Sequence, residues 1–357
     1  MRIIEKYEQF ISKQEYNDFQ QSIQWAKLKK YWENEIIIIY DENKNIIATM
    51  SILIRKVPVF GNIMYVPRGP IGDIHDENIL KEITERTKKI AKKYKAFVII
   101  IEPNIQNDDE KFKKVITKLG YKINNKAMKF DQEIQARHNF RLNIENKTEE
   151  EVFQSFSSKT RYNIRVAIKK GVTVVEKNLE GLEEFYRLME QTGKRDDFRI
   201  RPKEYFEDIL KKFPNQAKIF IAYHAEKPIA AIMPIRYGNK MWYLYGASGN
   251  ENRNCMPNYL LQWEMIKMAI KNNCKLYDFR GVSMDQGEQG GIFRFKKGFG
   301  GDFVELIGEI YMPFSRIKYV GYKIGKRVFC AARHFTYKHM HKDRVFEKVL
   351  ERKRKKE

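Results

Sequence analysis

The chain has 357 residues, of which 43% are hydrophobic and 13% aromatic, and this composition excludes a disordered polypeptide. Its three cysteines form no C-x-x-C pair and it has six histidines, which argues against a disulfide scaffold, a zinc ribbon and a metal site. The net charge is +22, and half of that excess lies in residues 312–357, which favours a polyanionic partner or surface. We find no signal-peptide pattern and no apolar run near the roughly 20 residues that cross a bilayer, so we expect a cytoplasmic protein.

A first series of elements is predicted between residues 35 and 120. Polar residues 42–44 separate two strand patterns and predict a hairpin, and a third strand ends at the turn 67–70. An amphipathic helix, a buried strand and a short helix follow. In chain order, the predicted ranges are 35–41, 45–57, 62–66, 77–93, 97–102 and 109–118.

The same series recurs between residues 217 and 300. In chain order, its predicted ranges are 217–224, 228–237, 241–247, 257–272, 276–279 and 291–297. Pro257 suits the first position of its helix. An N–H group at that position has no acceptor within the helix, so a proline there costs no hydrogen bond. Matched elements begin 179 to 183 residues apart, which predicts two copies of one fold.

This order of strands and helices is typical of the GNAT acyltransferase fold, so we predict an α+β protein with two tandem GNAT-like domains. We expect the first domain at residues 1–137, completed by residues after 305, the second at 138–304, and a basic helical tail at 312–357. The loops 68–73 and 249–254 lack the Arg/Gln-x-x-Gly-x-Gly/Ala pattern that binds coenzyme A. We therefore expect an acyl donor other than a coenzyme A thioester.

Aromatic and cationic residues alternate before the first hairpin. On a helix, Trp25, Leu28 and Trp32 would share one face, which leaves Lys29 and Lys30 outside. The spacing alone favours an aromatic anchor with lysine stems packed along it and their charges in water.

Residues 158–170 contain five cations and no acid. On a helix, Arg161, Arg165 and Lys169 form one row, which suits either a solvated face or the binding of phosphate oxygens. The apolar side of that helix would consist of Ile164, Ala167 and Ile168.

A third cationic segment begins at Arg201. Pro202 fits the first position of a helix, so Arg201 would flank a helix N-terminus, where free N–H groups favour an anion. Tyr205 follows one turn later. An ordinary helix start accounts for the pattern equally well.

Residues 292–298 alternate aromatic and cationic side chains after a glycine-rich loop. Rings beside positive charges can stack on bases or sugars. The chain contains no P-loop, G-x-S-x-G or H-E-x-x-H motif, which argues against ATP use, serine hydrolysis and zinc-protease chemistry.

Taken together, these segments resemble the Fem family of nonribosomal peptidyl transferases, which move an aminoacyl group from tRNA to a side-chain amine of a peptidoglycan precursor. The resemblance covers roughly residues 1–311, and the two GNAT-like domains of the family agree with the repeat. The motifs that carry it are Trp25–Lys29, Arg68-Gly69-Pro70, Ser158–Arg161, Arg201–Tyr205, Trp242–Tyr245, Asn258-Tyr259 with Gln262–Glu264, Tyr277-Asp278 and Phe295-Lys296.

The resemblance implies an acceptor site and a donor. Lys29, Arg201, Tyr205 and Tyr245 would hold the diphosphate of the acceptor and nearby muropeptide groups. Aminoacyl-tRNA would be the co-substrate, and its activated ester requires neither a cofactor nor a metal. We expect the tRNA on the row of Arg161, Arg165 and Lys169, and we expect a monomer.

The resemblance also implies catalytic residues. Phe295 and Lys296 would form an aromatic–lysine pair, and we expect Lys296 to stabilise the oxyanion of the attacked carbonyl. Glu102 stands at a carboxylate position, where it would help to deprotonate the amine. A glutamate that ends a buried strand is as often structural, and the substrate could supply its own base.

Three points stay open at this stage. Residues 217–300 leave no room for the coiled-coil arm of family members that lengthen glycine bridges, so the added amino acid could be alanine, serine or glycine. Whether a bridge is begun or extended is also open. The alternatives are a tandem GNAT acetyltransferase and a non-catalytic RNA- or membrane-binding module on a degenerate GNAT scaffold.

The tail carries an apolar helical stripe between its basic residues. The members of that stripe are Ile317, Val320, Ile324, Val328, Ala331 and Phe335. The stripe suits a closing helix packed on the first domain or a helix lying on the anionic inner leaflet. We favour the membrane, and with it a lipid-linked rather than a soluble nucleotide-linked acceptor.

Overall fold

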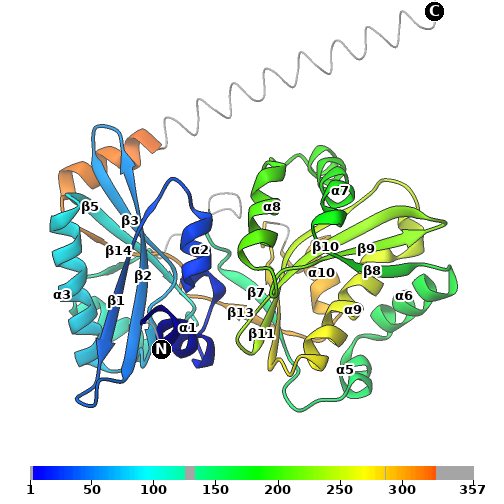
Figure 1. Ribbon diagram of the computed structural model, residues 1–357, viewed down its shortest axis with the longest axis horizontal. Helices are drawn as coiled ribbons and strands as arrows, with labels where there is room; N and C mark the ends of the chain where they lie inside the picture. The colour runs from blue at the N-terminus through cyan, green and yellow to red at the C-terminus, as the bar shows by residue number, and fades with distance from the viewer. Residues whose placement is uncertain (1–2, 125–132, 286, 327–357) are drawn as a thin grey trace, which may run out of the picture.

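The computed structural model describes residues 3–124, 133–285 and 287–326, which form two seven-stranded sheets beside each other (Figure 1). The first sheet has the order β1-β2-β3-β5-β14-β6, with β4 paired to β2. Its strands are β1 (Glu33–Tyr40), β2 (Ile46–Val57), β3 (Gly61–Arg68), β4 (Ile71–Gly72), β5 (Ala96–Pro103), β6 (Lys122–Ile123) and β14 (Ile310–Pro313). The parallel strands β3 and β5 are joined by the crossover helix α3 (Glu77–Lys93), and α4 (Glu110–Lys118) follows β5.

The second sheet has the order β13-β7-β12-β11-β10-β9-β8. Its strands are β7 (His138–Asn143), β8 (Thr173–Lys177), β9 (Ile219–His224), β10 (Lys227–Tyr237), β11 (Lys240–Ser248), β12 (Leu276–Gly281) and β13 (Asp302–Glu305). The parallel strands β11 and β12 are joined by α9 (Pro257–Lys271), which begins at Pro257 as predicted. The other helices are α5 (Glu149–Ser155), α6 (Ser158–Lys169), α7 (Leu182–Arg195), α8 (Lys203–Lys212) and α10 (Gly291–Lys297).

The predicted repeat is visible in these two sheets. An antiparallel pair, a third strand, a crossover helix and a parallel fourth strand occur in the same order as β1, β2, β3, α3 and β5 and again as β9, β10, β11, α9 and β12. After β13 the chain leaves the second sheet, and β14 pairs with β5 and β6 of the first. The domain boundary between residues 137 and 138 stays a prediction.

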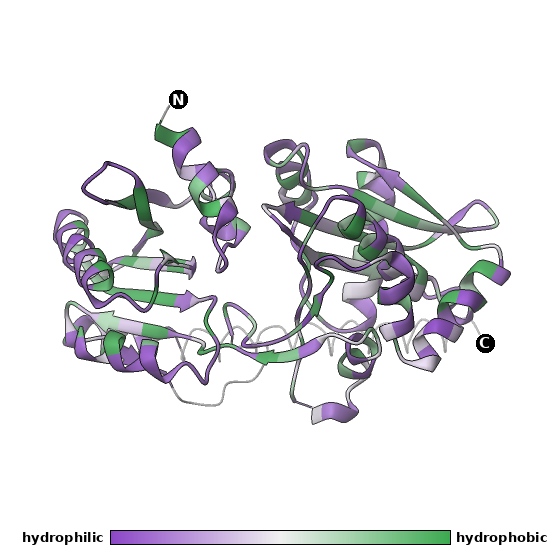
Figure 2. Cartoon of the chain, turned by 90° about the horizontal axis from the view of Figure 1, so that it is seen from below, coloured by the Kyte–Doolittle hydropathy of each residue, from purple (hydrophilic) through white to green (hydrophobic). Residues whose placement is uncertain are grey.

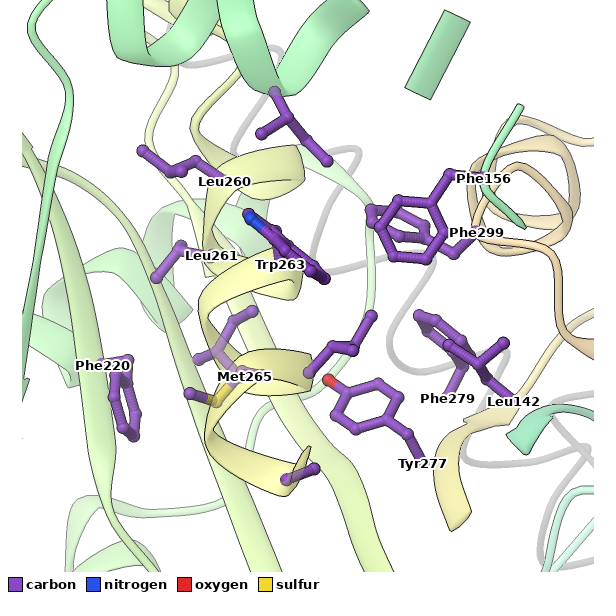
Figure 3. Packing of buried hydrophobic residues seen from close by; sticks show 14 of the residues in the cluster. Leu142, Phe156, Phe220, Leu260, Leu261, Trp263, Met265, Tyr277, Phe279 and Phe299 are labelled. Carbon is purple, nitrogen blue, oxygen red and sulfur yellow. The ribbon is translucent and has the colours of Figure 1, made fainter. Parts of the chain in front are cut away.

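The core of the second unit is built around α9. This helix is apolar on most of its circumference because it lies between the sheet and α6. Figure 3 shows Leu260, Trp263 and Met265 of α9 among aromatic side chains from neighbouring elements. Burial of each large apolar side chain contributes about 1.5–3 kcal/mol, so this cluster stabilises the packing of α9 on the sheet.

The N-terminal segment contacts both sheets. It consists of α1 (Ile3–Lys13), the 3-10 helix η1 (Phe19–Gln21) and α2 (Ile23–Leu28). The ring of Phe19 lies 5.2 Å from that of Trp242 in β11, whereas the amide of Gln21 donates to Pro67 O in β3 at 2.7 Å. This segment therefore holds the residues that follow α2 between the two sheets.

Hydrophobic residues concentrate on the strands, and hydrophilic residues on the outer faces of the helices (Figure 2). Among the helices within residues 3–124, 133–285 and 287–326, none is both long enough and apolar enough to span a bilayer.

Candidate functional site

Lys29 lies in the N-terminal segment between the two sheets. The helix α2 ends at Leu28, so the chain turns and directs the Lys29 side chain inward. Its ammonium donates to Tyr205 Oη at 3.1 Å and lies 4.0 Å from the centre of the Trp25 ring. The prediction that both lysines point outward is therefore wrong for Lys29, and Lys30 alone is exposed, where it pairs with Asp208.

The charges around Lys29 favour an anion. Burial and, to a lesser extent, the positive charge of Arg201 lower the pKa of Lys29 to about 7. The Arg201 guanidinium lies 5.4 Å from the centre of the Tyr205 ring. In the part of the chain that the structure describes, no carboxylate lies within 4.0 Å of either cation. An incoming anion would supply the missing counter-charge.

Two tyrosine hydroxyls extend this group. Tyr205 lies on α8 and Tyr245 on β11, and their hydroxyls are hydrogen-bonded to each other. Burial raises the pKa of both hydroxyls, so both are neutral donors at physiological pH. The structure thus brings together the four predicted acceptor residues. One detail differs: α8 begins at Lys203, which makes Pro202 the residue before the helix rather than its first position.

Lys296 lies on α10 and is buried against the end of β12. Its ammonium donates to the carbonyl oxygens of Phe279 and Gly281, both at 2.6 Å, and to that of Arg280 at 3.4 Å. Burial lowers the pKa of Lys296 to about 7; the charge of Asp278 raises it and that of Arg280 lowers it. All three N–H donors of the ammonium therefore face main-chain carbonyls.

The aromatic residues of α10 belong to the core. The ring of Phe295 packs against Tyr259 at 5.0 Å and Phe299 at 5.3 Å, and Phe293 is buried against Phe140. Phe293 is buried and is not available to stack on a base or a sugar, whereas Phe295 is half-buried, so its predicted role stays a prediction. Both rings fix the position of α10, and with it that of Lys296.

Glu102 lies near the end of β5 in the first sheet. The Tyr65 hydroxyl donates to Glu102 Oε2 at 2.6 Å, and the main-chain N–H of Gln135 donates to Oε1 at 3.1 Å. Burial raises the pKa of Glu102 to about 7, although the Tyr65 hydrogen bond and the charge of Arg68 oppose that rise. The carboxyl group can therefore accept and release a proton near neutral pH.

The sequence did not single out several residues that join these groups. Arg280, the residue before the last of β12, has a left-handed backbone (φ 57°), and its guanidinium donates to Gln135 Oε1 at 3.2 Å. Arg141 of β7 bonds Asp278 at 3.1 Å and also Asn104 beyond β5. A left-handed backbone is usually marked in a sequence by glycine or asparagine, so an arginine at that position gives no signal. The contacts of Arg141 join strands that are distant in the sequence, so no local pattern predicts them.

The predicted tRNA row lies on α6, on the far side of the second sheet from α2 and α8 (Figure 1). Arg165 and Lys169 are exposed, and the Arg165 guanidinium lies 5.4 Å from the Phe153 ring. Arg161 instead donates to the main-chain carbonyls of Gln154 and Phe156 at the end of α5. Ile168 is 58% exposed, which corrects its predicted place on the apolar side. The buried side of α6 consists of Thr160, Asn163, Ile164 and Ala167.

The tail begins as a helix over residues 316–326. Tyr319 and Tyr322 face the first sheet, with Tyr322 5.3 Å from the Phe97 ring. The predicted stripe faces away from the protein, since Ile317, Val320 and Ile324 are 87%, 55% and 57% exposed. Val328, Ala331 and Phe335 lie outside the described residues.

Within the described ranges, no group of three or more His, Cys, Asp or Glu side chains is arranged to hold a metal ion. The site instead consists of cations, tyrosine hydroxyls and one protonatable carboxyl group. Such a set can bind an anion beside a group that moves a proton.

Known proteins are similar to this chain in sequence and in fold. The profile of the FemAB family matches residues 4–227 and 222–327. A Weissella viridescens protein named UDP-N-acetylmuramoylpentapeptide-lysine N(6)-alanyltransferase is 30% identical over 314 residues, which cover 86% of this chain and 92% of that protein. The lipid II:glycine glycyltransferase of Staphylococcus haemolyticus (strain JCSC1435) is 27% identical over 379 residues, 85% of this chain and 90% of that protein.

Among solved structures, the crystal structure of FemX has a TM-score of 0.83 and 25% identity, and covers 89% of this chain and 98% of that one. A tandem GNAT protein from the clavulanic acid biosynthesis pathway has a TM-score of 0.50 and 9% identity, and covers 84% of this chain and 96% of that one. The predicted α+β class with tandem GNAT-like units is confirmed.

Proposed function

Since this chain belongs to the FemAB family, we propose that it is an aminoacyltransferase that adds an amino acid to the amine of a peptidoglycan precursor. The observation that carries this proposal is the anion-binding group of Lys29, Arg201, Tyr205 and Tyr245. A precursor with a diphosphate supplies the counter-charge that these two cations lack. We assign the diphosphate to this group.

The donor in this proposal is an aminoacyl-tRNA. The acceptor amine attacks the ester carbonyl carbon, a C–N bond forms, the ester C–O bond breaks, and the 3′ end of the tRNA leaves as an alcohol. The amine loses one proton and the leaving oxygen gains one, so no cofactor is consumed. Glu102 is the proposed proton acceptor because it is buried and half-ionised near neutral pH. Lys296 contributes positive charge, since its N–H donors are occupied by carbonyls.

Two further parts of the surface fit this reaction. Arg165 and Lys169 on α6 are exposed cations that suit tRNA phosphates. The helix at 316–326 has an outward apolar stripe beside Lys318 and Lys323, which suits the surface of an anionic membrane. Together with the basic tail, this helix favours a lipid-linked acceptor over a soluble one.

The proposal is tested by transfer of radiolabelled amino acid to muropeptide. Alanyl-, seryl- and glycyl-tRNA are each offered with a nucleotide-linked and a lipid-linked acceptor, and acetyl-coenzyme A serves as the control donor. We expect label on the acceptor with at least one aminoacyl-tRNA and none from acetyl-coenzyme A. Transfer from acetyl-coenzyme A alone would identify an acetyltransferase, and no transfer from any donor would exclude the proposed activity.

A further inference from the structure

Arg280 lies between the acceptor residues and Lys296 and has no role in the reaction described above. Its guanidinium is 5.7 Å from the centre of the Phe19 ring. The Phe19 ring meets the Trp25 ring edge-on at 5.2 Å, and Trp25 in turn carries the Lys29 ammonium on its face. Lys29 and Arg280 therefore lie over neighbouring rings of one aromatic cluster.

The positive charge of Arg280, like that of Arg201, interacts with the hydroxyls of Tyr205 and Tyr245. Burial raises the pKa of Tyr205 and Tyr245, and the positive charges of Arg201 and Arg280 both oppose that rise. Three cations thus surround one pair of hydroxyls. Lys29 follows the end of α2, Arg201 precedes the start of α8, and Arg280 lies on β12.

Most N–H groups of the Arg280 guanidinium have no acceptor among the described residues. It is half-buried, and among the hydrogen bonds of the described residues one of its five N–H groups has an acceptor, Gln135 Oε1. No carboxylate of those residues lies within 4.0 Å of it. Asp18 is near enough to interact with its charge, but the Asp18 carboxylate accepts the N–H of Gln20 and is buried. Fork-shaped donors that form no ion pair within 4.0 Å suit a phosphoryl group.

Lys296 holds the backbone that carries Arg280. A left-handed φ of 57° is strained for a residue with a side chain. The three carbonyls on which the Lys296 ammonium lies belong to residues 279–281, that is, to Arg280 and its two neighbours. Asp278 Oδ1 accepts the N–H of Arg280 at 2.6 Å and completes the turn.

We infer that Arg280 is the third cation of the acceptor site, where it binds a phosphoryl oxygen of the diphosphate, and that Lys296 is the residue that positions it. This inference rests on the proposed acceptor site and deepens it. A diphosphate that is substituted at both ends carries two negative charges. Because the pKa of Lys29 is lowered to about 7, Lys29 and Arg201 alone do not supply two full positive charges at neutral pH, and Arg280 supplies the remainder. The arrangement also joins the phosphate end of the acceptor to the end of β12, whose carbonyl oxygens the Lys296 ammonium contacts.

The test uses inorganic pyrophosphate and calorimetric titration, without tRNA or acceptor. The variant is Arg280→Gly, because glycine adopts the observed φ without strain and the fold should be kept or stabilised. Loss of a charge-assisted contact predicts about ten- to a hundredfold weaker binding. Arg280→Lys should retain part of the affinity, and Arg187→Gln, an exposed change on α7, should retain all of it. Equal affinity of Arg280→Gly and the unchanged protein, or no pyrophosphate binding at millimolar concentration, would overturn the inference.

The role of Lys296 is tested by combining substitutions. Lys296→Met should weaken pyrophosphate binding in the unchanged background, but it should add little in the Arg280→Gly background, because a positioning residue acts only through the residue it holds. Equal weakening in both backgrounds would overturn the positioning role. If Lys296→Met does not fold, Asp278→Ala removes the acceptor of the Arg280 N–H, a second support of the same turn, and is read in the same way.

These results are separable from those of the transfer assay. Pyrophosphate binding needs no chemistry, so a protein without transferase activity still reports on Arg280. Conversely, transfer with unaltered pyrophosphate binding by Arg280→Gly would retain the proposed function and remove Arg280 from the site.

Discussion

Burial moves the pKa of Glu102 up to about 7 and those of Lys29 and Lys296 down to about 7. A buried carboxyl group keeps its proton to higher pH, and a buried amine loses its proton at lower pH. Glu102 must be ionised to accept a proton, which requires a pH above its pKa. Lys29 must be protonated to bind an anion, which requires a pH below its pKa. We therefore expect a bell-shaped dependence of kcat/KM on pH with its maximum near 7.

Glu102→Gln should lower transfer by about two to four decades and remove the acidic side of that bell, because proton acceptance is lost. Tyr65→Phe is the matched variant: the Tyr65 hydroxyl donates to Glu102 and lowers its pKa, so its removal should shift the acidic side to higher pH. The measurement is kcat/KM between pH 5 and pH 9. An acidic side that persists in Glu102→Gln would mean that another group is the base.

Lys29→Met should raise the KM of the acceptor about ten- to a hundredfold and leave the KM of the tRNA unchanged, because a charge-assisted contact to phosphate is lost. Lys30→Met is the control, since this neighbouring lysine points outward and forms a surface pair with Asp208. Steady-state kinetics with each substrate varied separately gives the KM of the acceptor and the KM of the tRNA for both variants. Equal increases in both KM values would indicate a general structural effect.

At the scale of elements, periodicity predicted the strands, the crossover helices and the repeat, because an alternating or helical apolar pattern is a local property. Periodicity did not predict which side chains face a neighbouring element, because packing between segments that are distant in the sequence decides that. The stripe of Ile317, Val320 and Ile324 was expected to face either the first sheet or a membrane, and it is Tyr319 and Tyr322 that meet the sheet. The carbonyl groups that accept from Lys296 lie 15 to 17 residues away on another element, and no sequence pattern marks them.

The exposed stripe leads to a prediction about the helix at 316–326. Ile317→Asp with Ile324→Asp should abolish binding to vesicles that contain anionic lipid, because charges replace side chains that would enter the interface. Tyr319 and Tyr322 are unchanged, so the helix keeps its contact with the sheet. Co-sedimentation with anionic and with neutral vesicles is the measurement. Binding that persists in the double variant, or that ignores lipid charge, would reject the membrane role.

The helix α6 carries a separate prediction for tRNA. Arg165→Gln and Lys169→Gln should each flatten the dependence of log affinity on log salt by about 0.7–0.9, since each phosphate contact releases counterions. Arg161 is left unchanged because its guanidinium holds the end of α5. Filter binding at several salt concentrations gives the slope. An unchanged slope in the double variant would move the tRNA site away from α6.

At the scale of the whole molecule, the site exists because two sheets and the N-terminal segment meet. Glu102 comes from the first sheet, Lys296 and Arg280 from the second, and Lys29 from the segment that contacts both. Each sheet alone would carry an incomplete set. The relative position of the sheets is therefore part of the proposed site, and side chains that join the sheets should matter for stability.

Arg141 is such a side chain, because its guanidinium joins Asp278 of β12 to Asn104, which follows β5 of the first sheet. Arg141→Met leaves the buried Asp278 carboxylate without its cation, which should cost roughly 3 kcal/mol of unfolding free energy. Lys211→Met breaks an exposed i,i+4 pair with Glu207 and should cost at most about 0.5 kcal/mol. Denaturant unfolding of both variants measures the difference. If the two losses were equal, the contact between the sheets would be held by apolar packing around Phe19 and Trp242 instead.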